Sequence, residues 1–334
     1  MDGLCAKILE NYEIDIKAVK KTKGYYIING GGMFYALRKT SDTPERIEFR
    51  YKFQQNLLQK RFKNIEKIYP TREGGLFAMH DDQRYVLSDH ASGSEANFED
   101  RGELSRVLYA LADLHQKSRE ANAAREQFRA EDMGVRLAKI GTELSSLRKR
   151  ISAAKSLSDF DLLFFRNYEY YENNIDVAIS LLAAANYPEK IQEAFAQNSV
   201  CHNALKKETI LLCGEQVFFA ALGGISVDHF SSDIALIISK YMKYSEDRTI
   251  SVMEIIDMYS NSGHNKLDEN DCRLILARLL IPTVFMDATK QYYMKKRSWV
   301  PSAVTADLEH EINARDDFLR YIEPLAVYVG NEKL

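Results

Sequence analysis

Short segments rich in β-branched and aromatic residues, separated by turn residues, open the chain. Three of them, IDIKAVKKT, YYIIN and MFYALRKT, lie between residues 14 and 40, with Gly24 and Gly30–Gly32 between them. Such segments favour strands, and glycine supplies the positive φ that tight hairpins require. The pattern predicts two or three strands of an antiparallel sheet, in which the triple glycine is a hairpin turn rather than a phosphate cradle.

The next segment, TPERIEFRYKFQQNLLQKRF, changes to a helical period, with Pro44 at its start and Thr43 placed to cap it. Its apolar stripe runs through Ile47, Tyr51, Gln54, Leu57 and Leu58. Strand-like segments return in IEKIYPTREGGLFAMHDDQRYVLSDHA, where Gly74–Gly75 and Asp81–Asp82 read as turns. The chain up to about residue 90 is therefore expected to be a small sheet that carries one helix.

Helical periodicity dominates after Gly93. The first stripe consists of Leu104, Val107, Leu108, Leu111 and Leu114. A polar helical stretch follows through residues 120–183 and contains an aromatic cluster of a kind typical of helix packing. The cluster consists of Phe160, Phe164, Phe165, Tyr168, Tyr170 and Tyr171. Strand character returns between Val200 and Val227, and helices follow from Ser231 onward.

The order of these segments predicts the fold class. It runs from a small β-rich lobe over residues 1–90, through a hinge, to a larger, mainly helical lobe over residues 91–334 that contains a strand-and-loop insert. Few layered architectures have this order. The α+β, bilobal protein-kinase-like fold matches it best, with an antiparallel sheet and one helix in the N-lobe. A length of 334 residues agrees with a division into two lobes, since single hydrophobic cores stop growing at roughly 250–300 residues.

The composition and net charge of the chain disfavour several classes of function. The chain is 46% hydrophobic and 28% charged, which is typical of a globular protein. Its net charge of -3 gives no electrostatic case for a nucleic-acid partner. Its apolar runs are shorter than the ~18 residues of a membrane span, and MDGLCAKILENYEIDIK has acids where an export signal needs a basic start. We expect neither a membrane span nor export by a signal peptide.

The spacing of the cysteines does not predict a metal site. Cys5, Cys201, Cys213 and Cys272 are scattered without a CxxC pair, which favours a reduced compartment over a disulfide scaffold. A zinc site using Cys201 and His202 is disfavoured because no second ligand pair has suitable spacing. We therefore expect no metal site.

A kinase-like fold needs a lysine on the third strand, a carboxylate that orients the attacking hydroxyl and oxygen ligands for magnesium. The lysine position falls at the end of MFYALRKT, where Arg38 stands; Lys39 should then point to the opposite face of the strand. Arginine keeps the charge but has a different geometry, so contact with phosphate is weakened rather than excluded. A hinge around Val86, Leu87 and Ser88 would contact a nucleotide through its backbone.

The catalytic loop is expected within residues 200–212 as His-x-Asp-x-x-x-x-Asn, and the sequence there is VCHNALKKETILL. With His202 in place, Ala204 stands where the aspartate belongs and Thr209 where the metal-binding asparagine belongs. A register shifted by one residue puts Asn203 and Glu208 at those places. The amide of Asn203 cannot take a proton at neutral pH, so neither register restores a base.

The metal-loop strand is expected within residues 216–224. Ala220 and Ala221 occupy the place of the magnesium-binding aspartate there, and a methyl group offers no lone pair. Loss of a general base alone costs about 10²–10⁴ in rate, and loss of the metal ligands removes the charge neutralisation on which phosphoryl transfer depends. The pattern predicts a kinase-like cleft without catalytic residues.

Several segments together carry a family resemblance. In order they are KGYYIINGGGMFYALRK, RYVLSDHASGSE, LYALADLHQKS, SDFDLLFFRNYEYYENNIDVAISLL, SVCHNALKKETILL, VDHFSSDIALIISKYMK and YYMKKRSWVPSAVTADLEHEI. Their order and spacing resemble the CotS family of bacterial spore-coat proteins, relatives of the aminoglycoside and choline kinases.

The resemblance assigns roles to single residues. By it, Arg38 replaces the phosphate-binding lysine, Ala204 the catalytic aspartate, Thr209 the metal-binding asparagine and Ala221 the second metal aspartate. His202 is structural, and Asp233 matches an aspartate at a helix start, where a structural capping role is natural.

The resemblance also implies a place and a role. We expect a pseudokinase that is made in the mother-cell cytoplasm, is deposited in the spore coat and acts in coat assembly with other coat proteins. It needs no cofactor, and ATP would bind without magnesium. Two alternatives are an atypical small-molecule or protein kinase that holds metal with Glu208, Asp228 or another acid, and a non-catalytic nucleotide-binding switch.

Overall fold

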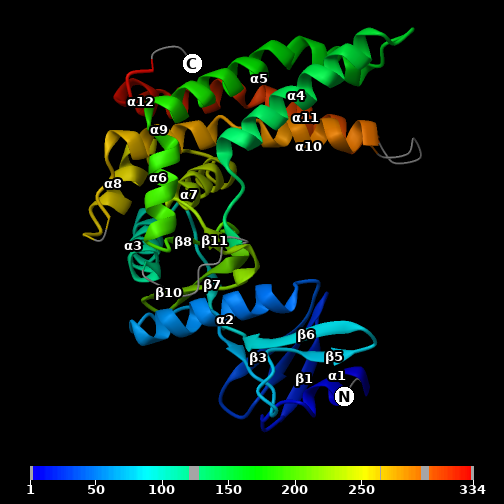
Figure 1. The fold of residues 1–334 in the computed structure, drawn as a ribbon, viewed down its shortest axis with the longest axis vertical. Coiled ribbons are helices and arrows are strands. Elements are labelled where there is room, and N and C mark those ends of the chain that lie inside the picture. Colours follow the sequence, from blue (N-terminus) through cyan, green and yellow to red (C-terminus); the bar gives the residue numbers. More distant parts are fainter. Residues whose placement is uncertain (1–2, 120–127, 264, 295–300, 332–334) are drawn as a thin grey trace. The chain divides into compact units, whose positions relative to one another are not determined.

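The computed structural model describes residues 3–119, 128–263, 265–294 and 301–331. It divides into two compact units (Figure 1). The first unit contains Met1–Arg129, Gln192–Ser245 and Met258–Lys266, and the second contains Ala130–Ile191, Glu246–Asp257 and Leu267–Leu334. The boundary expected at residue 90 lies inside the first unit, directly after a strand.

An antiparallel sheet forms the N-terminal part of the first unit. Its strands are β1 (Ala18–Lys21), β2 (Tyr25–Asn29), β3 (Phe34–Thr40), β4 (Ile68–Tyr69), β5 (Ala78–His80) and β6 (Gln83–Asp89). The order is β1-β2-β3-β6-β4, and β5 also pairs with β6. The triple glycine is the β2–β3 turn, as predicted: the Gly30 N–H donates to Met33 O at 2.9 Å, and Gly31 and Gly32 have positive φ.

Helix α1 (Gly3–Leu9) covers this sheet and was not predicted from the sequence. Its Cys5, Ile8 and Leu9 are buried in one cluster with the sheet residues Ile28 and Leu87. A helix of two turns gives too short a period to be recognised from pattern alone.

Helix α2 (Pro44–Gln59) begins as predicted, since the hydroxyl of Thr43 accepts a hydrogen bond from the Arg46 N–H at 3.3 Å. Its buried face is wider than the predicted stripe. Ile47, Gln54 and Leu57 are buried as expected, and Phe49, Arg50 and Phe53 are buried as well. The helix has neighbours on two sides, because Gln54 binds the backbone of Ile68 while the Phe49 ring stacks on Phe128 at 4.4 Å.

The rest of the first unit follows the prediction closely. The predicted stripe of α3 (Arg101–Ser118) is fully buried. The strand-and-loop insert consists of β8 (Val200–Cys201), β9 (Ile210–Cys213), β10 (Gln216–Phe219) and β11 (Ser226–Val227), with 3₁₀ turns at Lys207–Thr209 and Leu222–Gly224. β7 (Ser94–Glu95) pairs with β9, and β8 pairs with β11. The second pairing brings the predicted catalytic loop beside the segment that enters α7 (Ser231–Tyr244).

The second unit is helical. It contains α4 (Met133–Ser152), α5 (Asp159–Ala184), α9 (Glu269–Leu279), α10 (Thr283–Met294), α11 (Pro301–Asn313) and α12 (Arg315–Tyr328), while α6 (Tyr187–Ala196) and α8 (Val252–Ser260) each cross a boundary between units. The predicted stretch 120–183 is two helices in its described part, and residues 120–127 lie outside the described residues. A capping box at Ser158 and Asp161 starts the second helix.

The aromatic cluster of α5 packs between helices, as predicted. The rings of Phe164 and Tyr171 stack on Phe285 of α10 at 5.4 and 4.0 Å. Phe160 stacks on Tyr292 of the same helix at 4.0 Å. In the part of the chain that the structure describes, no helix has both the length and the apolar character needed to cross a bilayer.

Candidate functional site

The carboxylate of Asp233 joins the predicted catalytic loop to α7. Its Oδ2 accepts a hydrogen bond from the His202 N–H and its Oδ1 from the Asn203 N–H, both at 2.7 Å. The expected capping role is wrong, because Phe230 is the N-cap of α7 and no side chain caps the helix. β8 ends at Cys201, so the next two N–H groups have no strand partner and need an acceptor.

His115 of α3 is the second partner of this carboxylate. Its Nε2 lies 2.9 Å from Asp233 Oδ2 and its Nδ1 lies 2.7 Å from the Tyr259 hydroxyl, with His115 and Asp233 fully buried. Burial would raise the pKa of Asp233, but the hydrogen bond and charge of His115 and the backbone donor of His202 hold that pKa below its ordinary value. The carboxylate therefore stays ionised in the interior.

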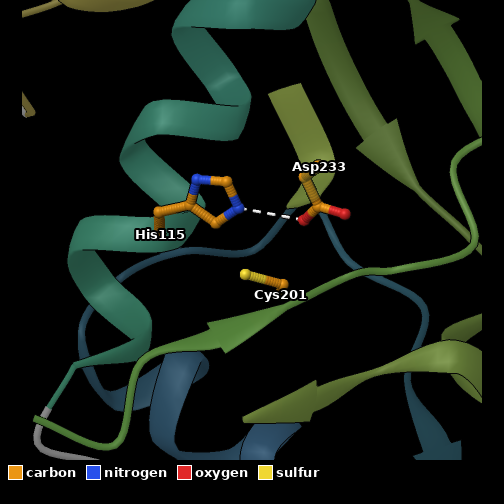
Figure 2. Close-up of side chains that lie close together, drawn as sticks. All are labelled: His115, Cys201 and Asp233. Carbon is orange, nitrogen blue, oxygen red and sulfur yellow. Dashed lines mark hydrogen bonds and ion pairs between the residues drawn. The ribbon is translucent and has the colours of Figure 1, made fainter. Parts of the chain in front are cut away.

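His115, Cys201 and Asp233 are also the candidate metal ligands of the described residues. Figure 2 shows them pointing toward one another from α3, β8 and α7, and their donor atoms lie within 4.8 Å of one another. A structural zinc needs four ligands in tetrahedral geometry. Here His115 and Asp233 are bonded to each other, and the Cys201 thiol donates to Asp228 O at 3.4 Å. The arrangement is that of a hydrogen-bonded core.

His202 connects the catalytic loop to the metal-loop strand. Its Nε2 lies 2.9 Å from the carbonyl oxygen of Ala220, which can only accept, so Nε2 carries the proton. Its Nδ1 then accepts from the Ala204 N–H at 3.3 Å. Burial lowers the pKa of His202 below 6.5, in agreement with a neutral ring. Both ring nitrogens of His202 are therefore engaged by backbone groups of neighbouring segments.

The three degenerate positions lie in this same region. The Ala204 methyl contacts Gly224 so closely that a Cβ added there would lie 2.6 Å from it. The Thr209 hydroxyl accepts from the Lys206 N–H at 2.8 Å and lies 3.0 Å from Lys206 O. Ala221 has a left-handed backbone, with φ of 58°. The positions expected to hold the base and the metal are thus filled by two methyls and a hydroxyl engaged within its own loop.

Glu66 is a buried residue of the site that the sequence did not predict. Its Oε1 accepts hydrogen bonds from the Arg38 guanidinium at 2.8 Å and from the Ser88 hydroxyl at 2.7 Å. Its Oε2 accepts from the N–H groups of Ala221 and Leu222 at 2.7 and 3.3 Å. One carboxylate therefore bridges β3, β6 and the metal loop. The signal in the sequence was a single acid between the apolar positions of IEKIY.

Arg38 is held in a fixed orientation on β3. Its guanidinium also lies 2.9 Å from Ser88 Oγ and 4.7 Å from the centre of the Tyr25 ring. The Arg38 side chain is 35% exposed. Lys39, next on the strand, is exposed.

The three residues that were predicted to contact a nucleotide at the hinge lie inside a strand. Val86, Leu87 and Ser88 are interior residues of β6, where all three pair with β3 and the last two also pair with β4. Their backbone groups belong to the sheet, so the connecting segment begins only after Asp89.

The two acids named for the active-kinase alternative have different surroundings. Asp228 is buried and its Oδ1 accepts from the N–H of His229 at 2.7 Å. Glu208 lies exposed on the 3₁₀ turn that follows Ala204.

A family model described as "Spore coat putative kinase YutH" matches residues 6–324. The chain belongs to this family. It is also 22% identical over 290 residues to "Spore coat protein S" of Bacillus subtilis (strain 168), which covers 85% of the chain and 82% of that protein. The resemblance to spore-coat proteins seen in the sequence is confirmed.

Solved structures confirm the fold of this family member. An aminoglycoside phosphotransferase from Alicyclobacillus acidocaldarius superposes with a TM-score of 0.82 at 14% identity, covering 97% of this chain and 96% of that one. Spectinomycin phosphotransferase gives 0.64 at 13% identity, covering 98% of each chain. A choline/ethanolamine kinase family protein from Mesorhizobium loti gives 0.54 at 10% identity, covering 99% and 98%. The α+β, kinase-like prediction is therefore right.

The packing of Ala204 against Gly224 predicts a sharp difference between two neighbouring glycines. Gly224→Ala should lower the free energy of unfolding by about 1–3 kcal/mol, because its methyl would overlap Ala204 and the His202 carbonyl. Gly223→Ala is the matched control, since nothing lies within 4 Å of its added Cβ. Urea unfolding of the two variants checks this; equal effects would contradict the close packing.

The buried neutral ring of His202 predicts a pH dependence of stability. Unfolding frees the ring to take up a proton below its ordinary pKa of 6.5, while the folded ring, whose pKa is lower, takes up none. The free energy of unfolding should therefore fall as the pH falls below 6.5, by up to about 1.4 kcal/mol per pH unit from this group.

His202→Gln should flatten that dependence while lowering stability overall, as measured by urea unfolding between about pH 5 and 7. His310→Gln, at an exposed position, serves as the control and should keep the wild-type slope. A wild-type slope in His202→Gln would show that the ring is not held neutral.

Proposed function

We propose that this chain is a catalytically inactive, kinase-like component of the spore coat that acts through assembly rather than phosphoryl transfer. The observation that carries the proposal is the joint presence of Ala204, Thr209 and Ala221 at the positions where the reaction needs a base and two metal ligands. None of these side chains can hold magnesium in its preferred set of oxygen ligands as a carboxylate would.

The nearby carboxylates support the proposal because they already have partners. Both oxygens of Glu66 are bound, by Arg38 and Ser88 on one side and by two backbone N–H groups on the other. Both oxygens of Asp233 accept backbone N–H groups within the core. To bind a metal, either residue would have to give up hydrogen bonds that compensate its burial.

A role in the coat is supported by the family and by the similarity to "Spore coat protein S". Other coat proteins are then the expected partners, with synthesis in the mother-cell cytoplasm before deposition. In this role the fold provides surfaces that bind other coat proteins, and it catalyses no phosphoryl transfer.

The purified protein should transfer no phosphate. Incubation with labelled ATP, magnesium or manganese, and spore-coat extract should give no incorporation above a heat-inactivated control. Transfer that is lost in Glu208→Gln or Asp228→Asn would overturn the proposal and establish the kinase that uses these acids.

Nucleotide binding without catalysis is a second candidate function, favoured by the geometry of Arg38. Glu66 and Ser88 hold its guanidinium in place, and the side chain is still 35% exposed. A preorganised guanidinium binds phosphate oxygens without help from a metal. Such a protein would respond to nucleotide as a switch.

This candidate predicts that millimolar ATP raises the melting temperature by about 2 °C or more in the presence of EDTA, through binding to the native state. Arg38→Ala should abolish the shift. Lys39→Ala removes an exposed charge from the same strand and should keep it. If the wild-type melting temperature does not change, the switch is excluded while the inactive coat component stands.

A further inference from the structure

Four lysines of the first unit lie on two segments, and two of them approach the ring of Tyr244. Lys206 and Lys207 follow the degenerate loop, and Lys240 and Lys243 lie on the last turns of α7. The Nζ of Lys207 lies 4.4 Å from the centre of the Tyr244 ring, and the Nζ of Lys243 lies 5.9 Å from it. We call these four lysines and the tyrosine the lysine patch. Lys207 and Lys243 are joined by this ring, and the charges of Lys206 and Lys243 both act on Lys240.

The charges of the lysine patch are not balanced by close carboxylates. Elsewhere lysines do form ion pairs, as Lys117 does with Asp113 at 2.9 Å and Lys290 with Glu143 at 2.8 Å. Among the residues that the structure describes, the four patch lysines have no carboxylate oxygen within 4.0 Å. The surface therefore carries a local excess of positive charge in a chain whose net charge is -3.

Like charges act on one another within the lysine patch. Burial lowers the pKa of Lys240, the charges of Lys243 and Lys206 lower it further, and only Glu208 acts in the other direction. Side chains at 240 and 207 are half-buried, while those at 206 and 243 are exposed. Such crowding destabilises the free protein, and an anionic partner would relieve it.

The size and chemistry of the patch favour carboxylates on a polypeptide over a nucleic acid. A nucleic acid is bound along an extended run of phosphates, for which a long basic stripe is needed, and a chain of net charge -3 repels a long polyanion. A short acidic segment meets only the local positive charge. Lysine ammoniums are compact point charges that do not impose the bidentate geometry by which arginine selects phosphate.

We propose that the lysine patch is a docking site for an acidic polypeptide segment, whose carboxylates lie between the four ammonium groups beside the Tyr244 ring. The site adjoins the degenerate loop, since Lys206 follows Ala204 by two positions. It needs neither nucleotide nor metal, so it is independent of whether the cleft transfers phosphate.

The test uses the full chain and a short fluorescein-labelled oligoglutamate peptide, with binding followed by fluorescence anisotropy at low and physiological salt. Replacing all four patch lysines (K206Q/K207Q/K240Q/K243Q) should weaken binding about tenfold or more. The matched control K20Q/K23Q/K139Q/K155Q changes the net charge equally at exposed lysines outside the patch and should bind like the wild type. Urea unfolding should show the patch variant to be at least as stable as the wild type, since repulsion is removed.

Three outcomes would overturn the proposal. The wild type could fail to bind the peptide at low salt, or both quadruple variants could lose affinity equally, which would mean unspecific attraction. A duplex DNA of equal charge could bind more tightly than the peptide and lose that binding in the patch variant, which would make the surface a nucleic-acid site. Labelled ATP assays on the same samples keep this result separate from the absence of phosphoryl transfer.

Discussion

The fold around the degenerate cleft depends on one buried negative charge. An ionised carboxylate in a protein interior is costly unless hydrogen bonds compensate it, and removing one partner of such a group costs about 3–5 kcal/mol. Asp233 meets that condition with the N–H groups of His202 and Asn203 and with the imidazole of His115. The same contacts fix the backbone of the predicted catalytic loop.

Two further contacts extend this support to the rest of the cleft. The His202 ring ties the loop to Ala220, and the Glu66 carboxylate ties the sheet to Ala221 through Arg38 and Ser88. The His202 ring and the Glu66 carboxylate are buried, and hydrogen bonds engage both, which is how buried polar side chains are stabilised. The backbone of the predicted catalytic loop and of the metal loop is therefore held by the side chains of Asp233, His202 and Glu66.

Local features of the fold could be predicted from the sequence because their causes are local. Thr43 caps the helix whose first residues follow it, the triple glycine makes its own turn, and the stripe of α3 repeats with the helical period. The kinase-like order of lobes followed from these elements.

The partners inside the site could not be predicted, because they are distant in sequence. His115 and Asp233 are separated by 118 positions, and Glu66 and Ala221 by 155. Pattern analysis could place Arg38, Ala204, Thr209 and Ala221 from a family resemblance, but it assigned Asp233 to the nearest helix end.

One residue in each of two segments, the predicted catalytic loop and the metal loop, has a backbone conformation that is costly for a residue with a Cβ. Asn203 and Ala221 both have positive φ, 54° and 58°, a conformation that costs a residue with a Cβ roughly 1–2 kcal/mol. Hydrogen bonds compensate this strain: the Asn203 amide donates to Ser226 and accepts from Ser232, and the Ala221 N–H donates to Glu66. The strained conformations are thus held by hydrogen bonds within the fold.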